Sequence, residues 1–137
     1  MRQSILTVLL ALFLGACAEG QAPLTASNII ITQPVPGMAM SAGYFELSNN
    51  SSQSISITHV TSPEFASVEM HETVIKNLVA RMTALGTLTL QAGETVSFEP
   101  GGKHLMLMRP SAEIDSVTLQ FFDDESLLLS VTTDFDR

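Results

Sequence analysis

Apolar and polar residues alternate along much of the chain from residue 27 onward, most clearly across Val117, Leu119 and Phe121. Alternation with period two places apolar side chains on one face of a β-strand. Turn-forming residues interrupt the pattern at intervals of roughly eight to twelve positions, as in all-β domains. The pattern predicts an all-β sandwich of about seven to nine mostly antiparallel strands. The expected strands cover residues 28–32, 42–47, 54–60, 66–71, 81–90, 94–98, 104–108, 116–122 and 127–133.

The N-terminus carries the pattern of a processing signal. Arg2 precedes a mostly apolar run from Ile5 to Leu14, which is shorter than the roughly 20 residues that a membrane-spanning helix needs. The run ends in Leu14-Gly15-Ala16-Cys17, which resembles the bacterial lipobox. The resemblance implies a signal peptide over residues 1–16 and a lipid anchor on Cys17. The alternative is an ordinary secretory signal with a chance cysteine at its cleavage site.

The segment after the cysteine predicts a tether. Residues 17–26 have no apolar periodicity, so we expect them to connect the lipidated Cys17 flexibly to a β-sandwich domain over residues 27–137. The resemblance to bacterial lipoproteins implies a protein held in the cell envelope and facing the periplasm. Ala18 stands where a retention signal would place Asp, which favours the outer membrane.

Composition narrows the function classes. The 137 residues are 45% hydrophobic, which suits one globular domain. The formal net charge of -8 excludes nucleic acid as a partner, because such proteins need a basic surface. A single cysteine excludes a disulfide framework, a thiolate zinc site, a redox CxxC pair and an iron–sulfur cluster.

Two histidines and two methionines stand out by their spacing. Met82 follows His71 after ten residues, His104 follows after twenty-one more, and Met106 lies two positions beyond His104. Residues i and i+2 of a strand share a face, so His104 and Met106 would present an imidazole and a thioether side by side. Taken singly, each residue is more often core or surface than ligand. Together, two imidazoles and two thioethers suit Cu(I) better than Zn²⁺, Mg²⁺ or Ca²⁺.

The same residues resemble the motif of the periplasmic copper chaperones called PCuAC. The similarity includes Ala42-Gly43-Tyr44-Phe45, the segment 67–73 and the segment 100–107, and it extends over about residues 30–133. It implies a cupredoxin-like (Ig-like) sandwich that binds one Cu(I) through His71, Met82, His104 and Met106. It also implies delivery to the dinuclear copper centre of cytochrome oxidase, in its subunit II, or to another copper chaperone. The chain departs from the family at Asn77-Leu78-Val79-Ala80-Arg81, because family members often have a glycine there, a few residues before the methionine ligand.

The remaining methionines have different expected roles. Met70 has the opposite strand parity from His71 and should lie in the core. Met108 shares the parity of His104 and is either a sulfur close to the site or a surface residue. Met38 and Met40, in a Gly/Pro-rich loop, either cover the site or have no role.

The other candidate polar residues are expected to be mostly structural. His59 lies in an alternating segment without a matching ligand partner. Glu69 and Glu72 either orient an imidazole or carry solvated charge. Residues 123–125 predict a hairpin turn and lack the ligand spacing of an EF-hand.

Competing functions remain at this stage. A blue-copper electron carrier needs a cysteine thiolate, and a thiol reductase needs a cysteine pair, so the single Cys17 argues against both. A copper-storage or tolerance protein and a structural or adhesion sandwich without metal stay open. No nucleophile, base and oxyanion constellation is present, which predicts a protein that is not an enzyme.

Overall fold

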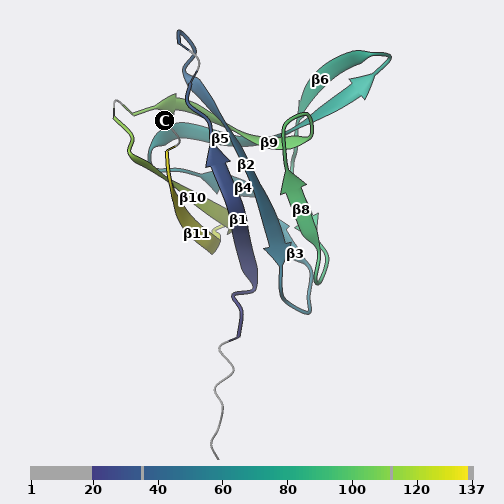
Figure 1. The fold of residues 1–137 in the computed structure, drawn as a ribbon. Helices are drawn as coiled ribbons and strands as arrows, with labels where there is room; N and C mark the ends of the chain where they lie inside the picture. The colour runs from purple at the N-terminus through teal and green to yellow at the C-terminus, as the bar shows by residue number, and fades with distance from the viewer. Residues whose placement is uncertain (1–19, 35, 112, 136–137) are drawn as a thin grey trace, which may run out of the picture.

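The computed structural model describes residues 20–34, 36–111 and 113–135, and within them it contains eleven strands and no helix (Figure 1). None of these residues therefore forms a helix that could cross a membrane. The predicted all-β sandwich is confirmed, with more strands than the expected seven to nine. The strands are β1 (Leu24–Ile31), β2 (Met40–Asn49), β3 (Ile55–Ile57), β4 (His59–Thr61), β5 (Phe65–Lys76), β6 (Val79–Ala84), β7 (Leu88–Leu90), β8 (Thr95–Phe98), β9 (Lys103–Pro110), β10 (Ser116–Asp123) and β11 (Ser126–Asp134).

The strands form one large sheet and two small ones. The large sheet has six strands in the order β1-β2-β8-β9-β5-β6. Strand β2 pairs with β9 through residues 40–43 and with β8 through residues 45–48. The order β11-β10-β4 makes a three-stranded sheet, and β3 pairs with β7. All pairs are antiparallel except the short parallel contact between β8 and β9.

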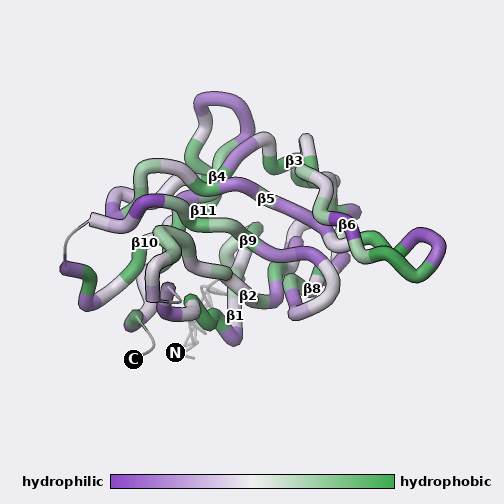
Figure 2. The backbone as a smooth tube through the Cα atoms, turned by 90° about the horizontal axis from the view of Figure 1, so that it is seen from above, coloured by the Kyte–Doolittle hydropathy of each residue, from purple (hydrophilic) through white to green (hydrophobic). Residues whose placement is uncertain are grey.

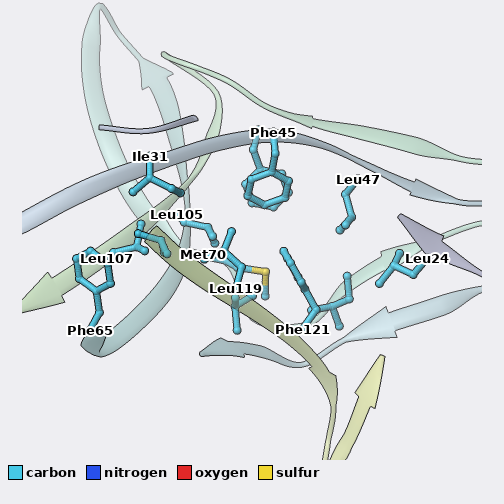
Figure 3. Packing of buried hydrophobic residues seen from close by; sticks show 14 of the residues in the cluster. Leu24, Ile31, Phe45, Leu47, Phe65, Met70, Leu105, Leu107, Leu119 and Phe121 are labelled. Atoms are coloured by element: carbon cyan, nitrogen blue, oxygen red, sulfur yellow. The ribbon is translucent and has the colours of Figure 1, made fainter. Parts of the chain in front are cut away.

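The core lies between the inner faces of these sheets. Phe45 stacks on Phe98 with ring centroids 4.4 Å apart and meets Phe121 edge-on at 5.6 Å. Leu105 and Leu107 of β9 point into the same core and are fully buried (Figure 3). Since successive side chains alternate between the faces of a sheet, the even-numbered residues of β9 lie on the outer face of the large sheet.

Several strand boundaries differ from the sequence expectation. The expected strand over 54–60 is divided into β3 and β4 at Thr58, whose N–H donates to the Phe122 carbonyl at 2.8 Å. The division occurs because β3 pairs with β7 whereas β4 pairs with β10. The domain also begins earlier than residue 27, because Leu24 is buried in the core and β1 starts there. The predicted tether over 17–26 is therefore wrong for residues 24–26.

The segment between His71 and Met82, expected to connect the strands over 66–71 and 81–90, is itself a hairpin. Strand β5 continues to Lys76, and β6 returns from Val79 with Lys76 paired to Val79. The two turn residues, Asn77 and Leu78, have φ angles of 51° and 65°. Two positive φ angles are typical of a type I′ turn, which matches the twist of a hairpin. The hairpin projects from the sandwich (Figure 1), and its projecting end is mostly hydrophobic up to a hydrophilic tip (Figure 2).

Candidate metal centre

The candidate site lies on the outer face of the large sheet, across β6, β5 and β9. His71 of β5 is paired directly with His104 of β9, and their ring centroids are 6.0 Å apart. Met106 lies two residues beyond His104, on the same face, where it is paired with Glu69. Direct cross-strand pairing therefore brings the two imidazoles together although they are far apart in the sequence.

The projecting hairpin brings Met82 to the same face. Met82 pairs with Thr73, which lies two residues from His71 on β5, so the three side chains share one face. The Met82 sulfur lies 3.2 Å from Nε2 of His104. Met82 is 61% exposed, since β6 is the edge strand of the sheet. One side of the site is therefore open to solvent.

The hydrogen bonding of His104 determines its tautomer, and therefore which ring nitrogen can donate an electron pair. Its Nδ1 lies 3.1 Å from the Gly102 carbonyl oxygen, which can only accept, so Nδ1–H is the donor. In the neutral ring, Nε2 then carries a lone pair. Thioether sulfur is also a weak electron-pair donor. A cation bound by both Nε2 of His104 and the Met82 sulfur would accept the electron pairs of these two atoms.

His71 is arranged in the opposite sense. Its Nε2 lies 2.9 Å from a carboxylate oxygen of Glu69, to which Nε2–H donates. Its Nδ1 is buried and has no hydrogen-bond partner among the described residues. An unpartnered buried acceptor costs free energy unless another group satisfies it, and a metal ion can do so. The Glu72 carboxylate instead pairs with Nζ of Lys103 at 2.8 Å.

A cavity of about 360 Å³ lies on the same face of the sheet. It is lined by four methionines from separate parts of the chain together with His104 and Tyr44. Met38 and Met40, which the sequence left without a defined role, are thus placed beside two of the candidate ligands. The four methionines are Met38, Met40, Met82 and Met106.

The structure brings some sequence candidates to the site and places others elsewhere. His59 stacks on Phe122 at 4.9 Å with parallel rings, which is a structural contact. Met70 is buried in the core, as predicted. No group of three or more His, Cys, Asp and Glu residues that could hold a metal occurs in the described part of the chain. Cys17 lies outside the described residues.

Solved structures with the same fold define the class of domain. The copper-bound PCuAC domain from PmoF2 superposes with a TM-score of 0.62 at 18% identity, over 82% of this chain and 90% of that one. The apo PCuAC domain from PmoF1 gives 0.64 at 14% identity, over 83% and 93%. Apo-DR1885 from Deinococcus radiodurans gives 0.60 at 21% identity, over 100% and 94%. The protein therefore has the cupredoxin-like β-sandwich of PCuAC domains, as the sequence resemblance predicted.

Sequence comparison gives the family. The model described as "LpqE-like: Putative lipoprotein LpqE-like" matches residues 24–133, and the chain belongs to this family. A protein named as a "Putative lipoprotein" of Leifsonia xyli subsp. xyli is 34% identical over 101 residues, covering 69% of this chain and 61% of that protein. An uncharacterized protein of Rickettsia prowazekii is 30% identical over 90 residues, covering 63% and 50%. The chain thus matches less than two thirds of the length of these relatives.

Proposed function

We propose that the protein is a copper carrier of the bacterial envelope, which binds one Cu(I) through His71, Met82, His104 and Met106. The observation that carries the proposal is the 3.2 Å approach of the Met82 sulfur to Nε2 of His104. Thioether and imidazole ligands together favour a soft monovalent copper ion over Zn²⁺ or Mg²⁺. The copper bound by the PCuAC domain from PmoF2, which has the same fold, supports the choice of metal.

The two imidazoles would ligate through different nitrogens. His104 donates Nδ1–H to Gly102 and would bind copper through Nε2. His71 donates Nε2–H to Glu69 and would bind through its unpartnered Nδ1. Hydrogen bonds of this kind fix the tautomer and the orientation of a metal-binding imidazole. The copper would retain a single positive charge, since all four ligands are neutral.

Transfer to a recipient is the second part of the proposal. Met82 is the ligand on the exposed hairpin, so a recipient can reach the metal by displacing its thioether first. A recipient with thiolate ligands would bind Cu(I) more strongly through softness and charge. We propose the dinuclear copper centre of cytochrome oxidase, or another copper chaperone, as this recipient. A lipid on Cys17 would hold the carrier at the membrane, facing the periplasm and with the outer membrane favoured. We assign it no catalytic reaction.

A Cu(I) competition titration tests the ligand set. The purified lipoprotein in detergent competes with a chromophoric Cu(I) chelator. Met82→Leu should weaken Cu(I) binding at least about tenfold, because loss of even a residue that supports a ligand by a hydrogen bond commonly weakens metal binding that much. His104→Ala should weaken it further. Met70→Leu is the matched control, since Met70 lies in the core and should not change the affinity. Wild-type affinity in Met82→Leu would contradict the assignment.

An experiment in cells distinguishes copper delivery from copper storage. Deletion of the gene should lower cytochrome oxidase activity at limiting copper, and added copper should restore it. The Met82→Leu variant should complement the deletion poorly. Normal oxidase activity combined with copper sensitivity in the deletion strain would instead indicate a storage or tolerance role.

A further inference from the structure

The methionines of this protein are concentrated on the face of the sheet that points away from the core. Met1 lies outside the described residues, and only Met70 of the remaining six is part of the buried core (Figure 3). Aliphatic and aromatic residues fill the rest of that core. Met82 and Met106 are assigned above to the copper site. Three further thioethers, those of Met38, Met40 and Met108, remain without a function.

Two of these three residues form a cross-strand pair. Met40 of β2 lies directly opposite Met108 of β9. Side chains of directly opposite residues have Cβ atoms about 4.5–5.5 Å apart on one face of the sheet. Met108 shares the parity of His104 and Met106, so the pair lies on the same face as the proposed copper site. Two thioethers can therefore approach one point.

The third thioether comes from the segment before β2. Met38 and Met40 both line the 360 Å³ cavity that also contains Met106 and His104. Met38 is half exposed and has no place in the core. Ala42, which is opposite Met106, is also part of the cavity wall, and its small side chain leaves room between Met40 and the copper site. The cavity thus connects Met38 and Met40 with the proposed ligands, and Met108 joins them through its pairing with Met40.

We propose that Met38, Met40 and Met108 form a second binding site for a soft monovalent cation, Cu(I) or Ag(I). Three neutral thioethers without an imidazole select soft ions against Zn²⁺ and Ca²⁺. Met108 lies two residues along β9 from Met106 and four from His104, which corresponds to about 7 Å and about 13 Å at roughly 3.3 Å per residue. The second site therefore adjoins the first, and it binds more weakly because it has no imidazole. It deepens the proposed function by providing a place where copper enters or leaves.

Metal stoichiometry tests this proposal. The full lipoprotein in detergent is titrated anaerobically with Cu(I), and in parallel with Ag(I), against a chelating competitor. We expect two equivalents for the wild type, the second weaker than the first. A triple variant with Met38→Leu, Met40→Leu and Met108→Leu should lose the weaker equivalent and retain the stronger one. Met70→Leu, which removes a core thioether, should retain both.

A second set of variants tests the two proposed sites independently. In a variant with His71→Ala and His104→Ala, the weaker equivalent should persist and then disappear when the three leucine substitutions are added. A wild type that binds one equivalent, or a triple variant that still binds two, would overturn the second site. An unchanged strong equivalent in the double histidine variant would instead overturn the proposed copper site. Circular dichroism of each variant establishes that the sandwich has formed.

Discussion

Glu69 should control copper affinity through His71 without contacting the metal. Its carboxylate accepts the Nε2–H hydrogen bond of His71 at 2.9 Å, and this bond leaves Nδ1 as the electron-pair donor. Glu69→Ala removes the acceptor, so the ring can change its tautomer or rotate. Because Glu69 supports the ligand from outside, the expected effect is weaker copper binding by a correctly folded domain.

The magnitude follows from the exposure of Glu69. A hydrogen bond to a charged group contributes about 1.5–3 kcal/mol when it is well shielded. The Glu69 side chain is 51% exposed, so water can replace part of the interaction, and the lower limit applies. A loss of about 1.4 kcal/mol corresponds to about tenfold weaker Cu(I) binding. Glu69→Gln keeps a neutral acceptor, about half as strong, and should weaken binding by about threefold.

Glu72 provides the matched control. It is the other carboxylate close to His71 in the sequence, but its side chain pairs with Lys103. In the Cu(I) competition titration, Glu72→Ala should bind nearly as well as the wild type. The unfolding free energy of metal-free Glu72→Ala should stay within about 0.5 kcal/mol of the wild type, as for most surface substitutions. That of Glu69→Ala should fall by no more than about 1.5 kcal/mol, the contribution of its hydrogen bond to His71. Equal losses of copper affinity in Glu69→Ala and Glu72→Ala, or none in either, would refute the positioning role.

Two further predictions concern stability. Burial raises the pKa of Glu64, but hydrogen bonds from the Thr118 N–H and the Ser62 hydroxyl lower it by more, so the pKa lies below its ordinary value of 4.5. Glu64 therefore stabilises the fold above about pH 4.5, and this contribution is lost as the pH falls through the folded-state pKa. Denaturation from pH 3 to 7 should show that Glu64→Gln loses most unfolding free energy, relative to the wild type, at neutral pH. A loss that is the same at every pH would contradict this. Leu78 is 98% exposed and has a φ of 65°. Leu78→Gly should therefore raise the unfolding free energy by about 0.5–1 kcal/mol, because the relief of backbone strain exceeds the cost of the added entropy of the unfolded chain. A lower denaturation midpoint in this variant would show that no such strain exists.

The fold was predictable because successive side chains of a strand lie on opposite faces of the sheet, so apolar and polar residues alternate along the sequence. Leu105 and Leu107 are fully buried, whereas Met106 between them is only partly buried. The strand boundaries were less predictable, since Thr58 lies at a point where the chain changes its pairing partner. Such a change depends on contacts with distant strands and leaves no local pattern.

The contact between Glu69 and His71 could have been predicted from parity. Glu69 lies two positions from His71 and shares its face, whereas Glu72 is adjacent and faces the other way. The positions of Met38 and Met40 beside the candidate site could not be obtained in this manner. They depend on the pairing of β2 with β9, which places Met40 opposite Met108. Only the sheet order shows that these strands are neighbours.

The ten-residue spacing between His71 and Met82 has a structural cause in the hairpin register. With a two-residue turn at Asn77 and Leu78, Thr73 pairs with Met82, so Met82 lies on the face occupied by His71. Insertion or deletion of one residue in β6 before Met82, with the turn retained, would shift this pairing by one position and turn the thioether to the opposite face. The same parity relates His104 and Met106 on β9. The motif therefore specifies which side of three neighbouring strands carries the candidate ligands, and its spacing places them together only in a sheet with this register.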